Sequence, residues 1–463
     1  MPRYLLREDI ALRSYENIPF CYCKKGERKP RILSRQEFSV LLSCDGKDVL
    51  PEDDTVRLLL ERGVIREKRT EDEALLPWQH YHYCSSDFAF GMNLEITQRC
   101  NCNCLHCFNA TGSEVPKEEL RLDQILHILD EAYECGIFSI TLTGGEPLLH
   151  RDFMAIADAA YERGIEINEL NTNGFFLTRE LLHQFRQKGY DPLIKISFDG
   201  IGFHDEMRGC AGMEDAALSA IRLAVEEGFR VMVQMNFNRR NASVILPSLR
   251  MLDEMHVFET RLIRTMETPR WEKLHQGESL DWETFYNSSI ELLQNYCSED
   301  HAMGLWVWPF VKASPVDRTY LETYVKFREG SYKGCASVCS AARTIPSIGA
   351  NGRIYPCLQA SGYFDAHGFV LGNVFENRLE DVLKAPAYRS TICMTLDERA
   401  RKFSECGSCE YFKICGGGCP ALGLLYSGAY GAPDPTKCLI YKRGIHQKIE
   451  KLFDDLGYGR LSV

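Results

Sequence analysis

The sequence lacks the features that would place a protein in a membrane or outside the cell. No run approaches the ~18 apolar residues needed to cross a bilayer, and the N-terminal segment MPRYLLREDIALRSYENIPF carries charges where a secretion signal has an apolar stretch. The chain also lacks a basic stripe, an internal repeat and a low-complexity tract, and its net charge of -11 argues against nucleic-acid binding. We therefore expect a soluble, cytoplasmic protein that binds neither a membrane nor nucleic acid.

Cysteine, by contrast, is abundant, with 20 in a chain of 463 residues. Because disulfides are not maintained in a reducing compartment, this surplus indicates metal ligation or thiol chemistry. Most of the cysteines fall into two groups, at 100–107 and 335–438, with only Cys135, Cys210 and Cys297 between them. The two groups therefore predict two separate metal-binding units.

The order of predicted elements divides the chain into six segments. Residues 1–72 are a small unit of strands and helices, in which Ser34 and Glu37 predict a capping box at a helix start, and Asp45 and Gly46 predict the end of that helix. The other segments are a linker (73–90), a strand–helix repeat (91–300), a bridge (301–334), a cysteine-rich region (335–440) and a C-terminal helix (441–463).

The strand–helix repeat predicts six strands, each followed by a helix. The strands are placed at 92–97, 138–143, 165–172, 193–198, 229–237 and 258–266, and the helices near 122–135, 152–163, 179–189, 214–227, 243–255 and 281–296. This alternation indicates parallel strands joined by right-handed crossovers. The expected fold class is α/β, with a partial (β/α)6 barrel similar to a TIM barrel, whose functional residues lie at the carboxyl ends of the strands.

The first cysteine group directly follows the first predicted strand. Cys100, Cys104 and Cys107 have the spacing C-x3-C-x2-C, and three thiolates on one loop can bind three irons of a 4Fe–4S cluster and leave the fourth iron open. A structural zinc site, the alternative, would require a fourth protein ligand. Cys102 lies within the same loop and makes the choice of the first pair ambiguous.

Polar residues follow the next strands at their carboxyl ends. Gly145 and Glu146 combine a close backbone approach with a carboxylate that can receive an ammonium group. Ser197 and Asp199, two residues apart, suit the hydroxyl groups of a ribose, and Arg208 can hold a carboxylate. Each segment alone is also consistent with an ordinary turn or cap.

These motifs in this order, C-x3-C-x2-C, GGEP, TNG and SFDG followed by HDEMRG, resemble the radical S-adenosylmethionine (SAM) enzymes. The resemblance covers about residues 90–300 and implies a 4Fe–4S cluster on Cys100, Cys104 and Cys107, with the amine and carboxylate of SAM on its open iron. It also implies that reductive cleavage of SAM produces a 5'-deoxyadenosyl radical, which removes a hydrogen atom from the substrate.

The same resemblance assigns SAM contacts to six residues. Gly145 and Glu146 would meet the amino group, Ser197 and Asp199 the sugar, Arg208 the carboxylate, and His106 would pack near the adenine.

The second cysteine group resembles the SPASM extension of radical SAM enzymes, which carries two auxiliary 4Fe–4S clusters. By this resemblance one cluster would be bound by Cys335, Cys339, Cys357 and Cys419, and the other by Cys406, Cys409, Cys415 and Cys438. Three clusters are expected in total. Two zinc ribbons are the alternative, because C-x2-C pairs also form zinc knuckles.

The N-terminal unit resembles the winged-helix-like peptide-recognition domain of enzymes that mature ribosomally made peptides. Such a domain binds a leader peptide as an added β-strand. The implied partners are a precursor peptide, bound through its leader, and an electron donor of the flavodoxin or ferredoxin type. A small dimerisation or packing domain is the alternative.

Together the resemblances predict a peptide maturase that forms a thioether crosslink. Carbon–carbon crosslinking and epimerisation are alternatives, and epimerisation would need a hydrogen-atom donor, for which Cys210 is the candidate. A sulfatase-maturing enzyme is disfavoured, because Leu358 stands where those enzymes have an Asp. From another class, the chain would be an iron–sulfur electron carrier or a zinc-stabilised peptide-binding module.

Overall fold

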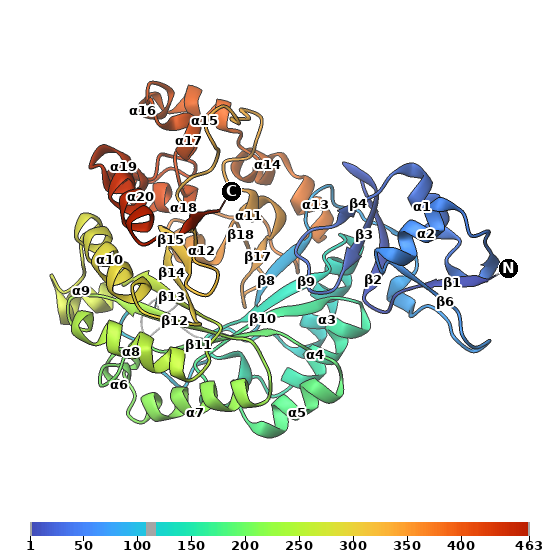
Figure 1. Ribbon diagram of the computed structural model, residues 1–463, viewed down its shortest axis with the longest axis horizontal. Coiled ribbons are helices and arrows are strands. Elements are labelled where there is room, and N and C mark those ends of the chain that lie inside the picture. The colour runs from blue at the N-terminus through green and yellow to red at the C-terminus, as the bar shows by residue number, and fades with distance from the viewer. Residues whose placement is uncertain (1, 108–116, 462–463) are drawn as a thin grey trace.

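The computed structural model describes residues 2–107 and 117–461. An N-terminal unit packs on one side of a curved central sheet, helices cover the outer face of that sheet, and a cysteine-rich region supplies strands at one of its edges (Figure 1). None of the described helices combines the length and the apolar character needed to cross a bilayer.

The N-terminal unit contains two small sheets and two helices. One sheet joins β1 (Arg3–Leu6), β5 (Asp45–Val49) and β6 (Ile65–Glu67), and the other joins β2 (Ile10–Tyr15), β3 (Ile18–Lys24), β4 (Arg31–Ile32) and β7 (His82–Tyr83). The helices are α1 (Arg35–Leu42) and α2 (Asp54–Glu61), and a short 3-10 turn, η1 (Pro77–Gln79), follows β6.

Two local predictions for this unit have different outcomes. The capping box at Ser34 and Glu37 is confirmed in both of its hydrogen bonds. The predicted helix end at Asp45 and Gly46 is wrong, because α1 ends earlier and these two residues begin β5. Gly46 has φ +80°, and an added Cβ would lie 2.8 Å from a Leu5 side-chain carbon, so its glycine allows β5 to pack against β1.

The central sheet begins with a run of parallel strands. These are β8 (Gly91–Glu95), β9 (Ser139–Thr143), β10 (Glu166–Thr172), β11 (Leu193–Ser197), β12 (Val231–Phe237), β13 (Glu259–Arg264) and β14 (Gly304–Trp308). The six predicted strands are confirmed, and the parallel run extends by one strand, β14, into the predicted bridge. The sheet ends at β18 and β19 without closing on itself, so the barrel is partial.

The helices of the repeat cover the outer face of this sheet (Figure 1). They are α3 (Leu122–Glu134), α4 (Phe153–Glu162), α5 (Arg179–Gln187), α7 (Met213–Glu226), α8 (Ala242–Glu254) and α10 (Trp282–Cys297), with the short η2 (Pro147–Leu149), α6 (His204–Arg208) and α9 (Pro269–His275) in the connections. Alternate strand residues such as Ile140 and Ile194 join the helices in the main hydrophobic core. The residues between them, such as Thr141 and Lys195, face the opposite side, which is the barrel lumen.

The C-terminal part extends the sheet at both edges. The antiparallel strands β15 (Val311–Ser314) and β16 (Thr319–Glu322) follow β14, and β19 (Gly459–Arg460) pairs with β16. At the other edge β17 (Ser347–Ile348) pairs in parallel with β8, and β18 (Ile354–Tyr355) pairs with β17.

Short helices make up the rest of the C-terminal part. They are α11 (Ser340–Thr344), α12 (Leu358–Ala366), α13 (Leu379–Lys384), α14 (Pro386–Ile392), α15 (Leu396–Lys402), α16 (Ser404–Gly407), α17 (Phe412–Cys415), α18 (Pro420–Ser427), α19 (Pro435–Lys442) and α20 (Ile445–Asp455).

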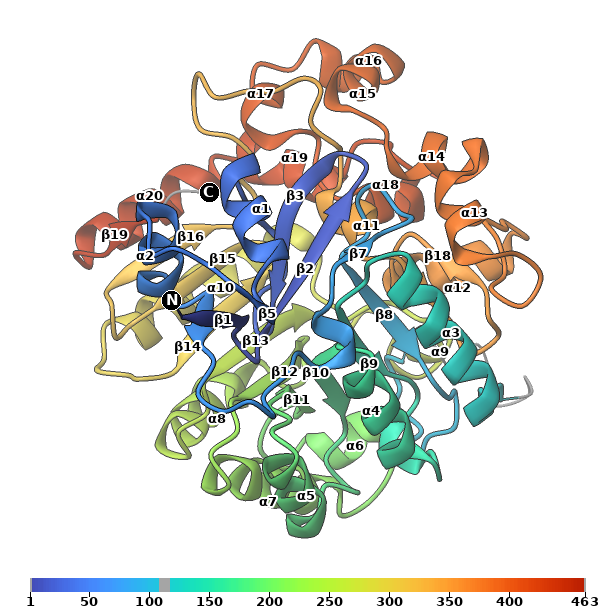
Figure 2. The same ribbon diagram turned by 90° about the vertical axis from the view of Figure 1, so that its right-hand side faces the viewer.

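The N-terminal unit contacts the barrel through its hairpin, and Figure 2 shows β2 and β3 in front of the central strands. The Tyr15 hydroxyl donates to the Gly136 carbonyl at 2.5 Å, and the Gly26 amide donates to the Glu166 carboxylate at 2.6 Å. Arg28, between β3 and β4, forms an ion pair with Glu169 of β10. The hairpin is thus tied to the first strands of the barrel.

Candidate active site

The first cysteine group lies on the loop after β8, at the carboxyl end of the barrel strands, as predicted. This loop carries Cys100, Cys104 and Cys107. The Asn103 amide donates to the Arg208 carbonyl at 2.9 Å, which joins the loop to the end of α6. The loop therefore has a fixed position against the element that carries the predicted Arg208 contact.

Cys102 lies between two of the predicted cluster ligands. Its amide donates to the Cys100 sulfur at 3.3 Å, and its thiol lies near the sulfurs of both Cys100 and Cys104. The neighbouring Cys102 thiol, with the nearby Arg208 guanidinium and against the effect of burial, lowers the pKa of Cys104 to about 5. The thiolate form that a metal requires is therefore favoured at Cys104.

Glu146 is fully buried and nearly saturated with hydrogen bonds. One of its oxygens accepts from the Thr172 hydroxyl (2.8 Å) and the Leu148 amide (3.1 Å), and the other accepts from the Asn173 amide (2.7 Å). Burial raises the pKa of Glu146 to about 7. Since a carboxylate offers about four acceptor positions, three donors leave room for one more, such as an ammonium hydrogen.

Gly145 brings the backbone before Glu146 close to the cysteine loop. The Glu146 amide donates to the Arg99 carbonyl at 2.8 Å, one residue before Cys100. A Cβ on Gly145 would overlap that same carbonyl, so any other residue would push the two segments apart. The glycine therefore sets the distance between the Glu146 carboxylate and the cysteine loop.

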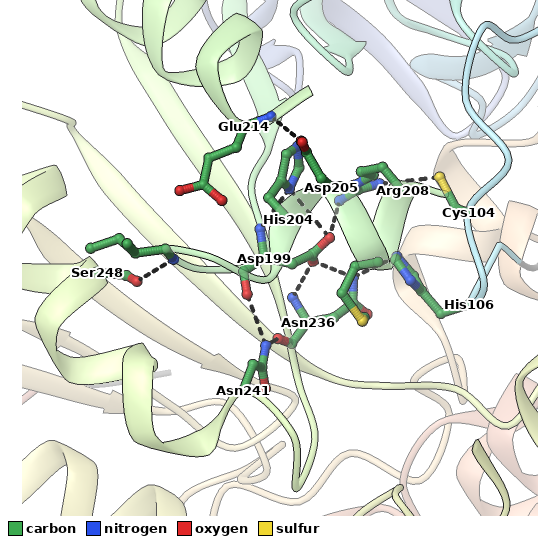
Figure 3. Close-up of polar contacts among 12 residues, drawn as sticks. Cys104, His106, Asp199, His204, Asp205, Arg208, Glu214, Asn236, Asn241 and Ser248 are labelled. Atoms are coloured by element: carbon green, nitrogen blue, oxygen red, sulfur yellow. Dashed lines mark hydrogen bonds and ion pairs between the residues drawn. The ribbon is translucent and has the colours of Figure 1, made fainter. Parts of the chain in front are cut away.

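Asp199 and Arg208, which were predicted to meet different parts of one ligand, are paired with each other (Figure 3). The distance between Asp199 Oδ2 and the Arg208 guanidinium is 2.9 Å, and Asp199 is completely buried. Burial alone would raise the pKa of Asp199, but the charge of Arg208 and the nearby His204 ring hold it well below its usual range. Asp199 is therefore ionised throughout the physiological pH range.

Asn236, on β12, connects this ion pair to His106 (Figure 3). Its backbone and side-chain amides both donate to Asp199 Oδ1 at 3.0 Å, and its side-chain nitrogen lies 2.9 Å from His106 Nε2. Arg208 also reaches Cys104, with 3.7 Å between the guanidinium and the sulfur. One hydrogen-bonded network thus links the cysteine loop, α6 and the carboxyl ends of β11 and β12.

Several polar atoms of this network have hydrogen-bonding capacity that the described residues do not fill. His106 Nδ1, His204 Nε2 and Arg208 Nε are buried without a hydrogen-bond partner there. The Ser197 hydroxyl, at the end of β11, makes no side-chain hydrogen bond within residues 2–107 and 117–461 and is partly exposed. Because buried polar groups are normally satisfied, these atoms fit a polar ligand bound beside the cysteine loop.

The second cysteine group separates into two sets in the structure. Cys339, Cys357 and Cys419 line a cavity of about 730 Å³, which also reaches the barrel lumen, and Cys415 of the other set lines the same cavity. Burial and the neighbouring Cys419 and Cys339 thiols raise the pKa of Cys357 to about 12. These three residues belong to the same predicted cluster.

The other set contains the four ligands predicted for the second auxiliary cluster, Cys406, Cys409, Cys415 and Cys438. Burial raises the pKa of Cys406 to about 12, with Cys415, Cys438 and Cys409 adding to the effect and Arg399 opposing it. The buried Arg399 donates to the carbonyls of Gly416 and Gly418, both at 2.9 Å, and to that of Ala432. This arginine therefore holds the glycine loop that joins the two sets.

Two predicted residues are not brought to these sets. Cys335 is exposed and does not line the cavity, and Cys210 lies on the turn after α6, where its sulfur contacts the Ala211 carbonyl at 3.9 Å. Their roles stay predictions. Among the described residues no three Cys, His or carboxylate side chains converge on a point that suits a single metal ion. A four-iron cluster instead needs its thiolates on separate irons.

Two protein-family models match the chain. Residues 94–239 match the radical SAM superfamily, and residues 339–410 match SPASM, an iron–sulfur cluster-binding domain. This chain is a radical SAM protein with a SPASM domain. Its radical SAM domain binds SAM and a 4Fe–4S cluster, its SPASM domain binds iron–sulfur, and the protein is an enzyme.

Curated relatives of this radical SAM protein include, by their names, a heme synthase, a maturase and a peptide cyclase. An AdoMet-dependent heme synthase of Methanosarcina barkeri is 26% identical over 76% of this chain and 96% of the relative. The mycofactocin maturase MftC of Mycobacterium tuberculosis is 26% identical over 74% of this chain and 81% of the relative. The PqqA peptide cyclase of Granulibacter bethesdensis is 25% identical over 75% of this chain and 87% of the relative.

Solved structures share the fold of this radical SAM protein. SuiB of Streptococcus suis, bound to its precursor peptide SuiA, superposes with a TM-score of 0.64 at 17% identity and covers 94% of this chain and 99% of SuiB. The enzyme anSMEcpe with AdoMet and a bound peptide superposes with a TM-score of 0.60 at 15% identity and covers 80% of this chain and 99% of that protein.

Sequence reasoning missed three residues that organise the site. Asn236, Arg399 and Asp434 were missed because they are polar residues outside any motif, and the chain has many polar residues at strand and loop ends. Asp434 accepts from the Cys419 amide at 3.1 Å and from the Thr436 hydroxyl at 2.7 Å, and so ties Cys419 to α19, which carries Cys438. The available signal was position for Asn236, one residue before the end of β12, and for Asp434, four residues before Cys438, whereas Arg399 within α15 gave no signal.

Proposed function

We propose that this radical SAM enzyme modifies a ribosomally made precursor peptide, and that it forms a thioether crosslink. The observation that carries the proposal is the extent of the shared fold. The likeness to SuiB spans 94% of the chain, whereas the sequence relatives match only about three quarters of it. The N-terminal unit is thus part of the fold shared with a protein that was solved with a precursor peptide.

The N-terminal unit offers an edge where a leader peptide can add as a strand. In the sheet order β4-β3-β2-β7, β4 lies at the edge and has only two residues, Arg31 and Ile32. The Ile32 side chain is 77% exposed. Unpaired edge groups give affinity to an added strand, and an exposed apolar side chain gives it a position to pack against.

The core of the peptide would enter the cavity of about 730 Å³. Its walls are the barrel lumen, with Thr141 and Trp306, and the C-terminal region, with Cys339 and Cys419. A substrate there would lie between the carboxyl ends of the strands and Cys339 and Cys419, which are proposed to bind one of the auxiliary clusters. When bound, SAM and the first cluster supply the 5'-deoxyadenosyl radical, and the auxiliary clusters supply acceptors for one electron.

The residues around the cysteine loop would then hold SAM. Glu146 receives the amino group at its remaining acceptor position, and Ser197 offers its free hydroxyl to the sugar. Asp199 positions two other residues. It orients Arg208 toward the SAM carboxylate and, through Asn236, orients His106 beside the adenine. Cys100, Cys104 and Cys107 bind the first cluster. An electron donor of the flavodoxin or ferredoxin type would reduce it.

The test is a mass measurement on a defined peptide. Anaerobically reconstituted enzyme is incubated with SAM, a reductant and the small peptide encoded beside its gene. A thioether gives a peptide that has lost two hydrogen atoms and one free thiol. Loss of two hydrogen atoms with the thiol retained would indicate a carbon–carbon crosslink, and an unchanged mass with one inverted residue would indicate epimerisation. SAM cleavage without any change in the peptide contradicts the proposal.

A second candidate follows from the heme synthase relative, whose sequence is matched over 96% of its length. This match leaves about a quarter of this chain without a counterpart, which is long enough to contain the N-terminal unit. A tetrapyrrole substrate would therefore leave that unit without a role in catalysis. Incubation with coproporphyrin III and its iron complex, followed by mass analysis, tests this candidate directly.

A further inference from the structure

The lumen of the barrel contains charged side chains that the proposed SAM site does not use. Lys195 of β11 and Arg261 of β13 lie on inward-facing positions, and Glu169 of β10 lies between Lys195 and the N-terminal unit. Arg261 is in register with Gln234 on one neighbouring strand and with Trp306 on the other. Of these residues Glu169 lines the cavity itself, and Arg261 lies against Trp306 and Trp308, which line it.

Two of the three cations near the lumen already have an acidic partner. Lys195 and Glu169 are 2.5 Å apart, and both are largely buried. Arg28 pairs with the other oxygen of Glu169, and Thr141 donates to the same carboxylate at 3.3 Å. Glu169 is therefore fully engaged and offers nothing further to a third cation.

Arg261 has no such partner. Within residues 2–107 and 117–461 its side chain makes no hydrogen bond or ion pair, and the Nε atom is buried and unsatisfied. Its guanidinium instead lies over the rings of Trp306 and Trp308, at 4.6 and 5.0 Å from their centroids. Burial lowers the pKa of Arg261 to about 10, so the side chain stays charged at neutral pH.

The other acidic side chain near Arg261 is only partly occupied. Glu259, two residues earlier on the same strand, forms an ion pair through Oε2 with Lys312 of β15, a fourth cation, while its Oε1 is buried without a hydrogen-bond partner among the described residues. Counted together, Arg28, Lys195, Arg261 and Lys312 carry four positive charges against the two carboxylates of Glu169 and Glu259, so this part of the barrel has an excess of positive charge. A buried charge without a counter-ion is costly, and an incoming anion would relieve that cost.

We propose that Arg261 binds a carboxylate of the substrate, so that the enzyme selects a substrate with an acidic group near the reacting position. The inference rests on the proposed function, in which the substrate occupies this lumen. Trp306 and Trp308 line the cavity and lie against the Arg261 guanidinium, whose unsatisfied Nε leaves a donor for a carboxylate that reaches it past these rings. The unsatisfied Trp306 Nε1 supplies a further donor at the same place.

The test measures binding to the cluster-loaded, full-length enzyme in the presence of SAM. Equilibrium dialysis compares two tripeptides with blocked ends, acetyl-Gly-Glu-Gly-amide and acetyl-Gly-Gln-Gly-amide, which differ in one charge. A charged hydrogen-bond pair in a buried site predicts that the acidic peptide binds about tenfold more tightly. Arg261→Gln should reduce this ratio to about one. Equal affinities in the wild type, or a ratio that survives Arg261→Gln, would overturn the inference.

A matched control is available on the outside of the barrel. Arg230 lies over the Phe258 ring at 5.8 Å and is exposed, so Arg230→Gln removes a guanidinium from an aromatic ring without changing the lumen. This variant should keep the tenfold ratio.

If Arg261→Gln fails to fold, butanedione labelling of the wild type replaces it. The acidic peptide should protect Arg261 from modification and the neutral one should not, and equal labelling overturns the inference.

Two further ligands identify the source of the carboxylate. Acetyl-Gly-Gln-Gly with a free C-terminus tests a terminal carboxylate, and coproporphyrin III tests a tetrapyrrole. Binding that depends on Arg261 supports the inference for whichever ligand shows it. If the enzyme crosslinks its peptide but shows no acidic preference, this inference fails and the proposed function stands. If the preference depends on Arg261 but no peptide is modified, the binding site stands and the proposed function fails.

Discussion

The carboxylate of Asp199 and the guanidinium of Arg208 form a buried ion pair, with 2.9 Å between their charged atoms, directly behind the cysteine loop. Through Asn236 the same carboxylate orients His106, and through Arg208 it reaches the Cys104 sulfur. A single acid therefore determines the position of two residues that are proposed to contact SAM.

Replacing Asp199 should be among the most damaging single changes in the barrel. Asp199→Asn keeps the shape of the side chain but leaves Arg208 buried without a counter-ion, which costs about 3–5 kcal/mol of unfolding free energy. Urea denaturation under anaerobic conditions measures this loss. The control is Glu226→Gln, which breaks a pair with Arg179 on the outer surface and should leave the unfolding free energy nearly unchanged. Equal effects of the two variants would contradict the buried ion pair.

The affinity for SAM should depend on pH through Glu146. Because burial raises its pKa to about 7, the free enzyme takes up a proton at Glu146 below that pH, and the ammonium group of SAM binds only the ionised form. We expect the affinity to fall as the pH drops below 7. Equilibrium dialysis of SAM across this range measures it. Glu146→Gln should bind SAM more weakly and lose the pH dependence. If this variant kept the pH dependence, the titrating group would be another residue.

The same carboxyl group should lower stability at high pH. A raised pKa in the folded state means that the contribution of Glu146 to stability is complete below its unfolded value of 4.5 and is lost as the pH rises through about 7. The unfolding free energy of wild type relative to Glu146→Gln should therefore decrease from acidic to alkaline pH. Urea denaturation at several pH values checks this trend. If the relative unfolding free energy increased with pH, the pKa of Glu146 would be lowered by folding and the prediction would be wrong.

The edge strand of the N-terminal unit should govern leader binding without affecting SAM cleavage. Ile32→Asp places a charge on an edge position that is 77% exposed, and should weaken binding of the precursor peptide about tenfold. Fluorescence anisotropy of the labelled peptide measures the affinity. Val316→Asp, at a position that is 65% exposed in the turn between β15 and β16, is the control and should bind normally. Unchanged binding by Ile32→Asp would place the leader on another surface.

Iron content should report the two cysteine sets separately. Three four-iron clusters give roughly twelve irons per chain, and Cys419→Ala or Cys406→Ala should each remove about four. Iron analysis of anaerobically purified protein measures the loss. Cys393→Ala, a partly buried cysteine outside both sets, should keep the full content. The proposed ligand sets would be wrong if Cys393→Ala lost iron or if Cys419→Ala kept it.

The barrel was predictable because its strands alternate with long amphipathic helices, and this pattern fixes both the number and the direction of the first six strands. β14 was missed because its five residues, Gly304–Trp308, follow α10 in a segment without a further helix. The cysteine and GGEP motifs located the site because their chemistry depends on spacing along the chain. Arg261 and Glu169 gave no such signal, because only the register between strands shows which charge is paired.

The pairing of β17 with β8 makes the folding of an early strand depend on a strand that is synthesised much later. Asn93, on β8, hydrogen-bonds to Ser347, which is 254 residues later in the chain. Until that part has been made, β8 has an unprotected edge, and the loop that it carries is held on one side only. Assembly of the radical-generating loop should therefore be delayed until β17 has emerged. A shortened chain that ends before β17 is expected to aggregate, and it would not form a smaller working enzyme.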